Sequence, residues 1–181
     1  MIGVLVSGEG TNLQALIDAG LPVVAVASNR KDARALDRAR GANIPTATFA
    51  LDCYAQREER DVVMATWLEE HGVELVVLAG YMHLLTAPFL ARFPDRIVNV
   101  HPSLLPRFPG AHPIDDALAA GVETTGVTVH LVDEGLDSGA VIRREAVPVE
   151  PRSTLVERIH AVEHRLLPQT VRELIGKTCA R

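Results

Sequence analysis

The sequence predicts an α/β fold, a Rossmann-like three-layer αβα arrangement with a mostly parallel central sheet and a C-terminal antiparallel hairpin. In the first half, continuous apolar runs rich in β-branched residues alternate with helical patterns. Continuous hydrophobicity is typical of strands buried on both faces of a parallel sheet, and strand–helix alternation predicts right-handed βαβ units. Further along, an alternating apolar and polar run precedes a second strand candidate, which predicts the hairpin.

The strands of the first half are expected at residues 2–7, 22–28, 45–49, 74–78 and 96–100. The first helix begins at Thr11, where residues 11–14 spell a capping box, and places Leu13, Leu16 and Ile17 on one face. Each strand is therefore followed by a segment long enough to return the chain to the same edge of a parallel sheet.

Two further helices are expected in the first half. Residues 31–40 form a helix that ends at Gly41. Residues from about 54 to 71 form an amphipathic helix with Val63 and Trp67 on its buried side, and Gly72 stands at its end.

The second half has a different texture. Residues 101–113 hold four prolines and a glycine, which predicts a structured loop. Strands are expected at 124–132 and 141–149, joined through residues 133–139. A second capping box at 154–157 opens a long helix bent near Pro168. The apolar stripe of this helix consists of Leu155, Ile159, Val162 and Leu166.

Length and composition set the broad class. The 181 residues suit one domain, spanning 1–181, and 48% apolar with 23% charged residues excludes a disordered chain. The net charge of −5 argues against nucleic acid as the partner, because phosphate contacts need a basic stripe. Cys53 and Cys179 have no paired spacing, which favours a reducing compartment without a disulfide framework. No leader pattern and no stretch of about 18 apolar residues occurs. A cytoplasmic protein with no membrane partner is therefore expected.

A glycine-containing turn lies between the first strand and the first helix, with the residues Gly8-Glu9-Gly10-Thr11-Asn12. Glycines let the backbone turn tightly, and the N–H groups of a helix N-terminus attract anions. The third glycine of a dinucleotide fingerprint is missing, because Leu13 and Gln14 follow. A monophosphate is thus favoured over NAD, although a plain strand–helix turn is the simpler interpretation. The side chain of Glu9 is expected to point to solvent.

Two polar side chains, Asn99 and His101, stand two residues apart at the end of the predicted strand 96–100 and therefore share one face. An amide and an imidazole at the carboxyl end of a strand suit a site that stabilises an oxyanion. A strand-end histidine on its own is more often structural. The turn at 133–139 carries three carboxylates, which fit solvated surface or a calcium loop, although EF-hand spacing is absent. A carboxylate here could instead hold a histidine. His160 and His164, with Glu163 between them, match a zinc-peptidase spelling but lack a third ligand.

Six segments in this order resemble the phosphoribosylglycinamide formyltransferase family, part of the formyltetrahydrofolate-dependent formyltransferase superfamily. They are Gly8–Asn12, L-A-G-Y-M at 78–82, N-V-H-P-S-L-L-P at 99–106, F-P-G at 108–110, G-V-T-V-H at 126–130 and L-D-S-G at 136–139. The resemblance covers nearly the whole chain, from about residue 2 to 174. The H-P-S-L-L-P and L-D-x-G elements are shared across the superfamily, and the G-x-G-T-N loop implies a phosphosugar acceptor.

The resemblance implies a phosphosugar-binding half at 1–100 and a folate-binding, catalytic half at 101–181. It implies that Gly10, Thr11 and Asn12 hold the phosphate and that Glu163 accepts ribose hydroxyls. Catalytic positions fall on Asn99, His101 and Asp137. Folate-binding positions fall on Arg57, Met82, His83, Leu84, Leu85, Asn99, Asp133, Glu134 and Asp137. No metal and no tightly bound cofactor are implied; 10-formyltetrahydrofolate is a cosubstrate, and the protein is a monomer or homodimer.

The implied reaction is transfer of the formyl group of 10-formyltetrahydrofolate to the amine of glycinamide ribonucleotide, in de novo purine (IMP) biosynthesis. The amine attacks directly, through an oxyanionic tetrahedral intermediate. A formyltetrahydrofolate hydrolase and a non-enzymatic phosphosugar-binding module are the alternatives. Two positions depart from the family pattern. His83 stands where many relatives have Arg and is expected to point outward, and Arg143 replaces a commonly uncharged residue.

Overall fold

The fold is that of a computed structural model, which describes residues 1–178. The chain divides into two compact units, Met1–Val98 and Asn99–Arg181. The strand β5, Ile97–His101, crosses from the first unit into the second. Each unit carries a group of the sequence-predicted site residues.

The first unit is built on parallel strands in the order β3-β2-β1-β4. They span Ile2–Val6 (β1), Val23–Ser28 (β2), Thr46–Thr48 (β3) and Leu75–Leu78 (β4). Every residue of β1 is buried, as expected for a strand paired on both sides and covered on both faces. The parallel strands predicted from the continuous apolar runs are therefore present.

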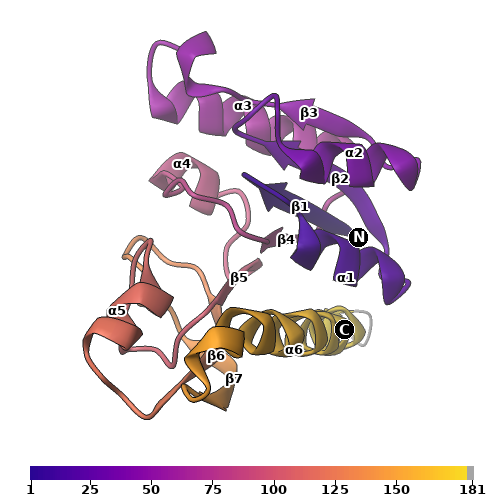
Figure 1. Cartoon of the computed structure of the whole chain (residues 1–181). Coiled ribbons are helices and arrows are strands. Elements are labelled where there is room, and N and C mark those ends of the chain that lie inside the picture. The colour runs from indigo at the N-terminus through magenta and orange to yellow at the C-terminus, as the bar shows by residue number, and fades with distance from the viewer. Residues whose placement is uncertain (179–181) are drawn as a thin grey trace. The chain divides into compact units, whose positions relative to one another are not determined.

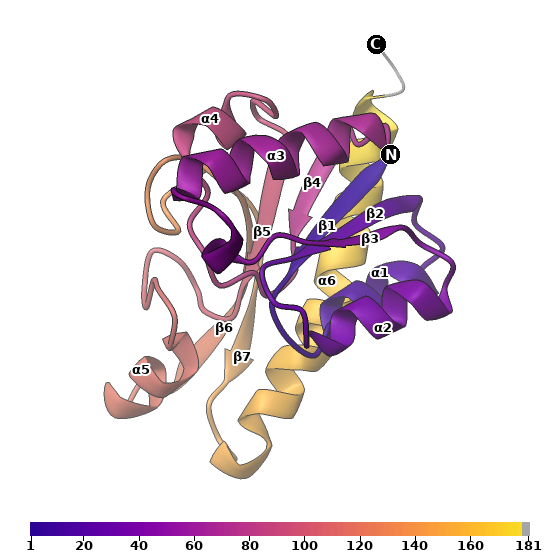
Figure 2. The same ribbon diagram turned by 90° about the horizontal axis from the view of Figure 1, so that it is seen from above.

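Helices cover both faces of these strands. They are α1 (Thr11–Asp18), α2 (Arg34–Gly41), α3 (Arg57–Glu70) and the short α4 (Ala87–Leu90), with a 3₁₀ turn at Leu51–Cys53. Figure 2 shows α1 and α2 together on one side of the strands and α3 with α4 on the other. This placement follows from right-handed crossovers, which put consecutive connections in the same direction along the sheet on one face.

Close packing of α3 on the sheet requires a glycine in β1. A Cβ at Gly3 would lie 2.9 Å from side-chain carbons of both Leu68 and Val73. Real Cβ atoms do not approach other carbon atoms so closely. Helix α3 and the segment that follows it can therefore pack at this distance from β1 only because residue 3 is a glycine. The core of the first unit thus depends on a small residue in a strand that is otherwise large and apolar.

Several predicted helix details are wrong. Thr11 does not cap α1; Gly10 is the N-cap residue, in a left-handed conformation at φ 74°. The second helix begins at Arg34 rather than residue 31 and includes Gly41, because Ala42 is its C-cap. The buried face of α3 does not contain Val63, which is 43% exposed.

The stripe that α3 buries contains two charged residues. It consists of Arg60, Asp61, Met64, Ala65 and Leu68. The buried stripe is therefore rotated from the face of Val63 that the sequence predicts. The ion pair between Arg60 and Asp61 removes the contradiction, because paired charges can be buried.

The second unit contains the predicted hairpin. β6 (Thr124–Leu131) pairs antiparallel with β7 (Val141–Pro148), with Gly126 opposite Ala146. The helix α6 (Leu155–Thr178) packs against both strands and includes Pro168 (Figure 1). Its buried residues include Leu155, Ile159, Leu166 and Leu167. A helix α5, at Pro113–Ala119, and a 3₁₀ turn, at Arg152–Thr154, were not predicted.

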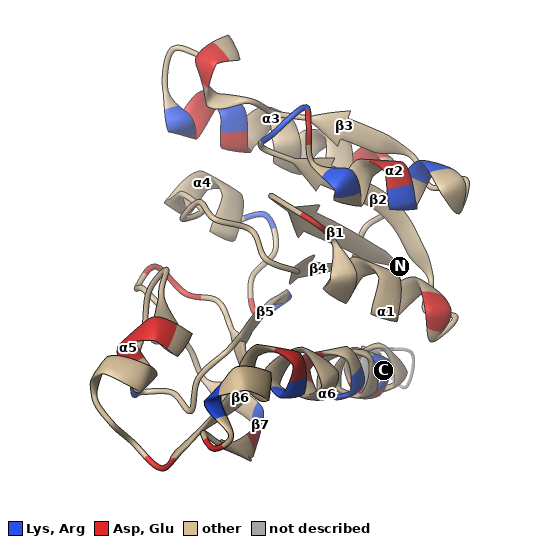
Figure 3. Ribbon diagram, viewed as in Figure 1, with Lys and Arg blue, Asp and Glu red and all other residues tan. Residues whose placement is uncertain are grey.

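Charged residues of both signs are interleaved along α2 and α3 (Figure 3). Among residues 1–178, no helix is both long and apolar enough to span a bilayer. Cys53 is exposed and free, and Cys179 lies outside the described residues. Because their charges are of both signs, neither α2 nor α3 is purely basic.

Candidate active site

Three of the predicted site residues meet in the second unit. Asn99 and His101 lie at the carboxyl end of β5, and Asp137 lies in the loop between β6 and β7. Oδ2 of Asp137 is 3.5 Å from Nδ1 of His101, and Nδ2 of Asn99 is 3.4 Å from Oδ1 of Asp137. The fold of the hairpin loop therefore brings together the amide, imidazole and carboxylate that the sequence pattern grouped.

The ring of His101 faces an acceptor at each nitrogen. Its Nε2 lies 2.8 Å from the carbonyl oxygen of Phe108, and its Nδ1 faces the Asp137 carboxylate. A carbonyl oxygen only accepts hydrogen bonds, so Nε2 carries a hydrogen. A carboxylate beside a ring nitrogen attracts any positive charge that the ring carries. His101 is itself 4% exposed, and water does little to screen this attraction.

Asp137 is held by its backbone as well as by its side chain. Its φ is 52°, in the left-handed region that aspartate tolerates better than most residues. Its Oδ2 accepts the backbone N–H of Gly110 at 2.8 Å. Burial acts to raise the pKa of Asp137, but the hydrogen bond from His130, the Gly110 N–H and the charges of His101 and His130 outweigh it, so that the pKa is lowered. Asp137 is therefore an anion at neutral pH.

A fourth member of the site, His130, was not predicted. It lies on β6, is 2% exposed, and has its Nε2 3.6 Å from Oδ1 of Asp137. Its Nδ1 is 2.7 Å from the carbonyl oxygen of Leu131, so Nδ1 carries a hydrogen, and its Nε2 lies 3.2 Å from Nδ2 of Asn99. The amide of Asn99 thus bridges His130 and Asp137. The alternation of residues 124–132 could have indicated His130, because polar residues on a buried strand need partners.

A second polar residue of β6 supports the loop that follows His101. The hydroxyl of Thr128, which is fully buried, donates to the carbonyl of Ser103 at 2.7 Å and accepts the N–H of Leu105 at 3.1 Å. The Ser103 hydroxyl in turn donates to the carbonyl of Arg107 at 2.6 Å. These bonds hold the loop that places the Phe108 carbonyl against His101.

The acidic residues before Asp137 have different surroundings. Oδ1 of Asp133 accepts the N–H of Gly135 at 3.0 Å and the hydroxyl of Ser138 at 2.8 Å. Asp133 therefore folds the hairpin loop, whereas Glu134 and Leu136 are exposed on it. A Cβ at Gly135 would lie 2.0 Å from the Ser138 oxygen and would displace that hydroxyl from Asp133.

The glycine turn of the first unit leaves the start of α1 uncapped by any described side chain. A helix N-terminus of this kind attracts anions, because its first N–H groups point away from the helix. Gly10 is required by packing: its φ is 74°, and a Cβ there would lie 2.5 Å from the Cβ of Ala35 on α2. The Glu9 side chain is exposed, as expected, and pairs with Arg34 at 3.1 Å.

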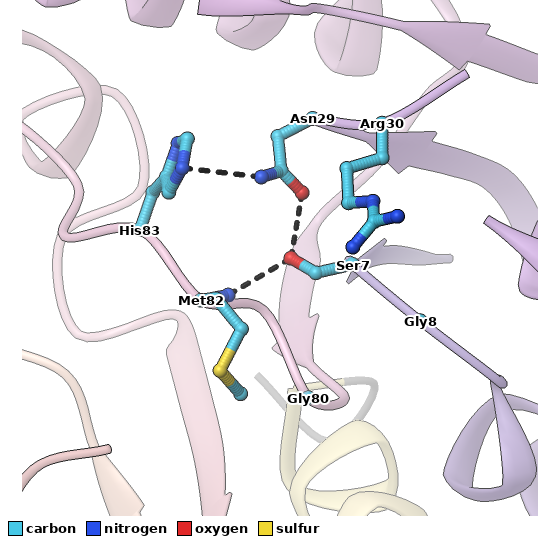
Figure 4. A pocket seen from close by; sticks show the side chains of 7 residues that line it. All are labelled: Ser7, Gly8, Asn29, Arg30, Gly80, Met82 and His83. Atoms are coloured by element: carbon cyan, nitrogen blue, oxygen red, sulfur yellow. Dashed lines mark hydrogen bonds between the residues drawn. The ribbon is translucent and has the colours of Figure 1, made fainter. Parts of the chain in front are cut away.

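A pocket of about 440 Å³ opens beside this turn (Figure 4). It is lined by Ser7, Gly8, Asn29, Arg30, Gly80, Met82 and His83. The expectation that His83 points outward is wrong. His83 is partly buried, its Nδ1 is 2.7 Å from Arg60, and its Nε2 is 3.2 Å from the amide of Asn29. The polar groups of its neighbours hold the ring inward.

The remaining predicted residues lie in separate places. Met82 and Leu84 are 65% and 52% exposed, Leu85 is partly buried, and Arg57 is exposed at the start of α3, all in the first unit. Glu163 is buried on α6 in the second unit. His160 and His164 stack with ring centroids 6.1 Å apart. Within residues 1–178, no group of three or more His, Cys, Asp and Glu side chains is arranged to hold a metal ion.

Residues 1–171 match the protein family described as formyl transferase. The chain is 43% identical over 98% of its length to the trifunctional purine biosynthetic protein adenosine-3 of Drosophila melanogaster, and it spans only 14% of that protein. It is 44% identical to the phosphoribosylglycinamide formyltransferase of Mycobacterium tuberculosis, covering 94% of this chain and 83% of the relative.

A crystal structure of phosphoribosylglycinamide formyltransferase from Bacillus halodurans superposes with a TM-score of 0.94 at 39% identity, covering 98% of this chain and 96% of that one. The predicted fold class is therefore confirmed. The resemblance that the six sequence segments carry is confirmed as well.

Proposed function

The chain belongs to the formyl transferase family, and on that premise we propose that it transfers the formyl group of 10-formyltetrahydrofolate to the amine of glycinamide ribonucleotide. The observation that supports this most is the cluster of Asn99, His101, His130 and Asp137, in which one carboxylate faces two histidines and an amide. The reaction would serve de novo purine biosynthesis.

The reaction moves one formyl group between two nitrogens. The acceptor's amine attacks the formyl carbon, a new C–N bond forms, and the carbonyl oxygen becomes an oxyanion. Collapse of this intermediate breaks the bond to N10 of the folate, and a proton passes from the attacking amine to N10. Groups that stabilise the oxyanion and move this proton are therefore the ones that lower the barrier.

Asn99 and His101 suit the oxyanion. The contacts of the Asn99 amide to His130 and Asp137 are long, at 3.2 and 3.4 Å, so one amide hydrogen can turn to a substrate oxygen at little cost. An imidazolium at His101 supplies positive charge in a buried place, where charge acts strongly. Asp137 favours that charged form and can accept the amine's proton through water.

Binding of the two substrates is assigned to separate segments. The N–H groups at Gly10, Thr11 and Asn12 would hold the acceptor's phosphate, and Glu163 would accept its ribose hydroxyls. The exposed apolar side chains of Met82 and Leu84, together with His83, Leu85, Arg57, Asp133 and Glu134, would contact the folate.

A formyl-transfer assay with the acceptor present or omitted tests the proposal. We expect the assay to yield formylglycinamide ribonucleotide and free tetrahydrofolate. Both products should form only when glycinamide ribonucleotide is present. Tetrahydrofolate release at the same rate without the acceptor would instead identify a hydrolase. Binding of glycinamide ribonucleotide with no turnover of either kind would leave only a phosphosugar-binding module.

A further inference from the structure

A buried ion pair lies behind the pocket of the first unit. Arg60 and Asp61 are both fully buried. Two nitrogens of the Arg60 guanidinium, Nε and Nη2, donate to Oδ1 of Asp61 at 2.8 and 2.6 Å. The other Asp61 oxygen accepts the backbone N–H of Thr86 at 2.8 Å. The guanidinium is therefore fixed in place, and its remaining nitrogen, Nη1, is aimed at His83 at 2.7 Å.

The contact between Arg60 and His83 decides where the imidazole carries its hydrogen. A guanidinium donates hydrogen bonds and cannot accept them, so Nδ1 of His83 must present its lone pair. A neutral ring then carries its hydrogen on Nε2. The pKa of His83 is lowered by burial and by the charges of Arg60 and Arg57, which outweigh the opposite effect of Asp61, so the neutral ring is the stable form.

The hydrogen on Nε2 determines the orientation of the Asn29 amide. Figure 4 shows the amide nitrogen toward Nε2 at 3.2 Å and the amide oxygen toward Ser7 Oγ at 2.6 Å. This orientation sets an N–H of Asn29 against the N–H of His83. Rotation of the amide by half a turn exchanges two groups of nearly equal size and makes both contacts favourable. The amide oxygen then accepts from His83, and the amide nitrogen donates to Ser7.

In this arrangement the Ser7 hydroxyl hydrogen is free to donate to another acceptor. Its Oγ already accepts the backbone N–H of Met82 at 2.9 Å. With a second N–H arriving from Asn29, both lone pairs are used, and the hydroxyl hydrogen must find another acceptor. The hydroxyl faces the pocket, where an acceptor can reach it. The exposed guanidinium of Arg30, which also pairs with Asp32, lines the same pocket. A hydroxyl donor beside a cation selects an oxyanion.

We propose that Arg60 is a positioning residue that, through His83 and Asn29, turns the Ser7 hydroxyl into a hydrogen-bond donor to an oxyanionic substrate group in this pocket. The group is a phosphate or a carboxylate, and the proposal rests on the proposed function for the substrates that carry them. The groups that face the His83 ring are Arg60, Arg57, Asp61, the Asn29 amide and the Tyr81 ring, 5.9 Å away between centroids.

The state of His83 can be measured without any substrate. Two-bond ¹⁵N–¹H spectra of protein labelled in its histidine rings distinguish the tautomers, and the His83 signal is the one lost in His83→Gln. Hydrogen on Nε2 is expected at pH 8, and the ring should take up a second proton only at a lower pH than an ordinary histidine does. Hydrogen on Nδ1, or ordinary titration, in the wild-type protein overturns the proposal even if no variant folds.

Two variants separate positioning from stability. Arg60→Gln removes the obligate donor, so His83 should show both tautomers and titrate at higher pH. Asp61→Asn is the matched control, because it breaks the same buried pair but leaves the guanidinium facing His83. The tautomer should survive in Asp61→Asn. Loss in both variants, or in neither, contradicts the role of Arg60.

Calorimetry on Ser7→Ala tests the donor and identifies its acceptor. The ligand pairs are glycinamide ribonucleotide with its dephosphorylated riboside, and a formylfolate analogue with and without its glutamate. Affinity should fall about tenfold or more for the charged member of one pair only, as for loss of a hydrogen bond to a charged group. That pair shows whether the phosphate or the glutamate carboxylate accepts the hydrogen bond from Ser7. No difference within either pair overturns the proposal.

The same experiment separates this proposal from the proposed function. Arg60→Gln should weaken the same ligand as Ser7→Ala, and the double variant should be little weaker than either, because both remove one donor. Full additivity contradicts the chain of contacts. Inorganic phosphate and acetate, titrated against wild-type and Ser7→Ala protein, report the oxyanion site even if the protein transfers no formyl group. Equal affinities for both proteins then count against the site itself.

Discussion

Asp137 combines two requirements at one residue. Its backbone is left-handed, and its carboxylate receives the Gly110 N–H while facing His101 and His130. Asparagine satisfies the backbone requirement and keeps one oxygen for Gly110, but it has no charge. Alanine satisfies neither requirement.

We therefore expect Asp137→Asn to keep its thermal stability to within about 1 kcal/mol while turnover falls by ~10²-fold or more. The loss should be similar across the neutral range, because the pKa of Asp137 is lowered and its carboxylate is charged throughout that range. Steady-state rates from pH 6 to 9, with melting curves on the same samples, check both parts. Turnover close to that of the unchanged protein would show that the charge of Asp137 is not needed.

His101 and Asp137 should behave as one unit. His101→Ala is expected to lower turnover by ~10²–10³-fold, as for removal of an oxyanion donor. The double variant with Asp137→Ala should be little slower than the slower single variant, because each change disables the same charge. Single-turnover rates and substrate dissociation constants provide the comparison. Rates that multiply fully would separate the two roles.

The residues of the site were predictable to different degrees. Asn99 and His101 could be grouped because a strand end and a spacing of two are local properties. The burial of Arg60 and the inward position of His83 could not, because their contact joins residues 23 positions apart, and the pairing of Arg60 with its neighbour Asp61 is equally possible on an exposed helix face. A charged residue on a helix carries no local sign that its counter-ion will be buried with it.

At the scale of elements, the glycine turn is fastened to α2. The N–H of Ala35 donates to the carbonyl of Gly8 at 3.0 Å, and Nε of Arg38 donates to the carbonyl of Glu9 at 2.8 Å. These bonds bring the α2 backbone against Gly10. The turn's shape is therefore set by the next helix as well as by its own glycines.

Gly10→Ala should destabilise the protein by about 1–3 kcal/mol, because the new methyl group meets Ala35 and the backbone is left-handed. Gly8→Ala is the matched control: a Cβ there meets nothing within 4 Å, and a change of about 0.5 kcal/mol or less is expected. Urea unfolding of both variants gives the comparison. Equal stabilities would mean that α2 can move away.

The loop after β5 depends on β6 in a similar way. Thr128→Val keeps the shape of the side chain but leaves the buried N–H of Leu105 and carbonyl of Ser103 without their partner. A loss of about 1–3 kcal/mol in unfolding free energy is expected. Turnover should fall as well, because the same loop carries the Phe108 carbonyl. Thr125→Val, on the same strand, removes a buried hydroxyl with no described partner and should cost less.

Elements with simple periodicity were predicted best. All five strands of the first half were found to within two residues at each end, because continuous apolar runs have few other uses. The short helices α4 and α5 were missed, since four to seven residues carry too little periodicity. The prediction of the buried face of α3 is wrong because this face carries a charged pair, and charged residues are usually found on exposed faces.

At the scale of the whole chain, stability should fall as the pH is lowered below about 6.5, the ordinary pKa of histidine. Burial lowers the pKa of His83 and of His164, with help from Arg60 and Arg57 in the first case and from His160 in the second. The unfolded chain therefore binds protons first, and acid favours unfolding.

Melting temperatures between pH 8 and 5 check this expectation. His83→Gln and His164→Gln should each flatten the slope, whereas the exposed His112→Gln should leave it unchanged. If none of the variants changes the slope of melting temperature against pH, other groups must cause the pH dependence. Because the two histidines lie in different units, the two reductions should add.

The division of the chain within β5 has a consequence for protein engineering. Ile97 and Val98 belong to the first unit, and Asn99 begins the second. In a recombination library made from related genes, a crossover at this point would inherit the glycine turn and the Ser7 pocket from one parent. Asn99, His101, His130 and Asp137 would come together from the other. Such chimeras would inherit the Ser7 pocket separately from the four-residue cluster of the second unit, whereas a crossover between His130 and Asp137 would divide that cluster between the parents.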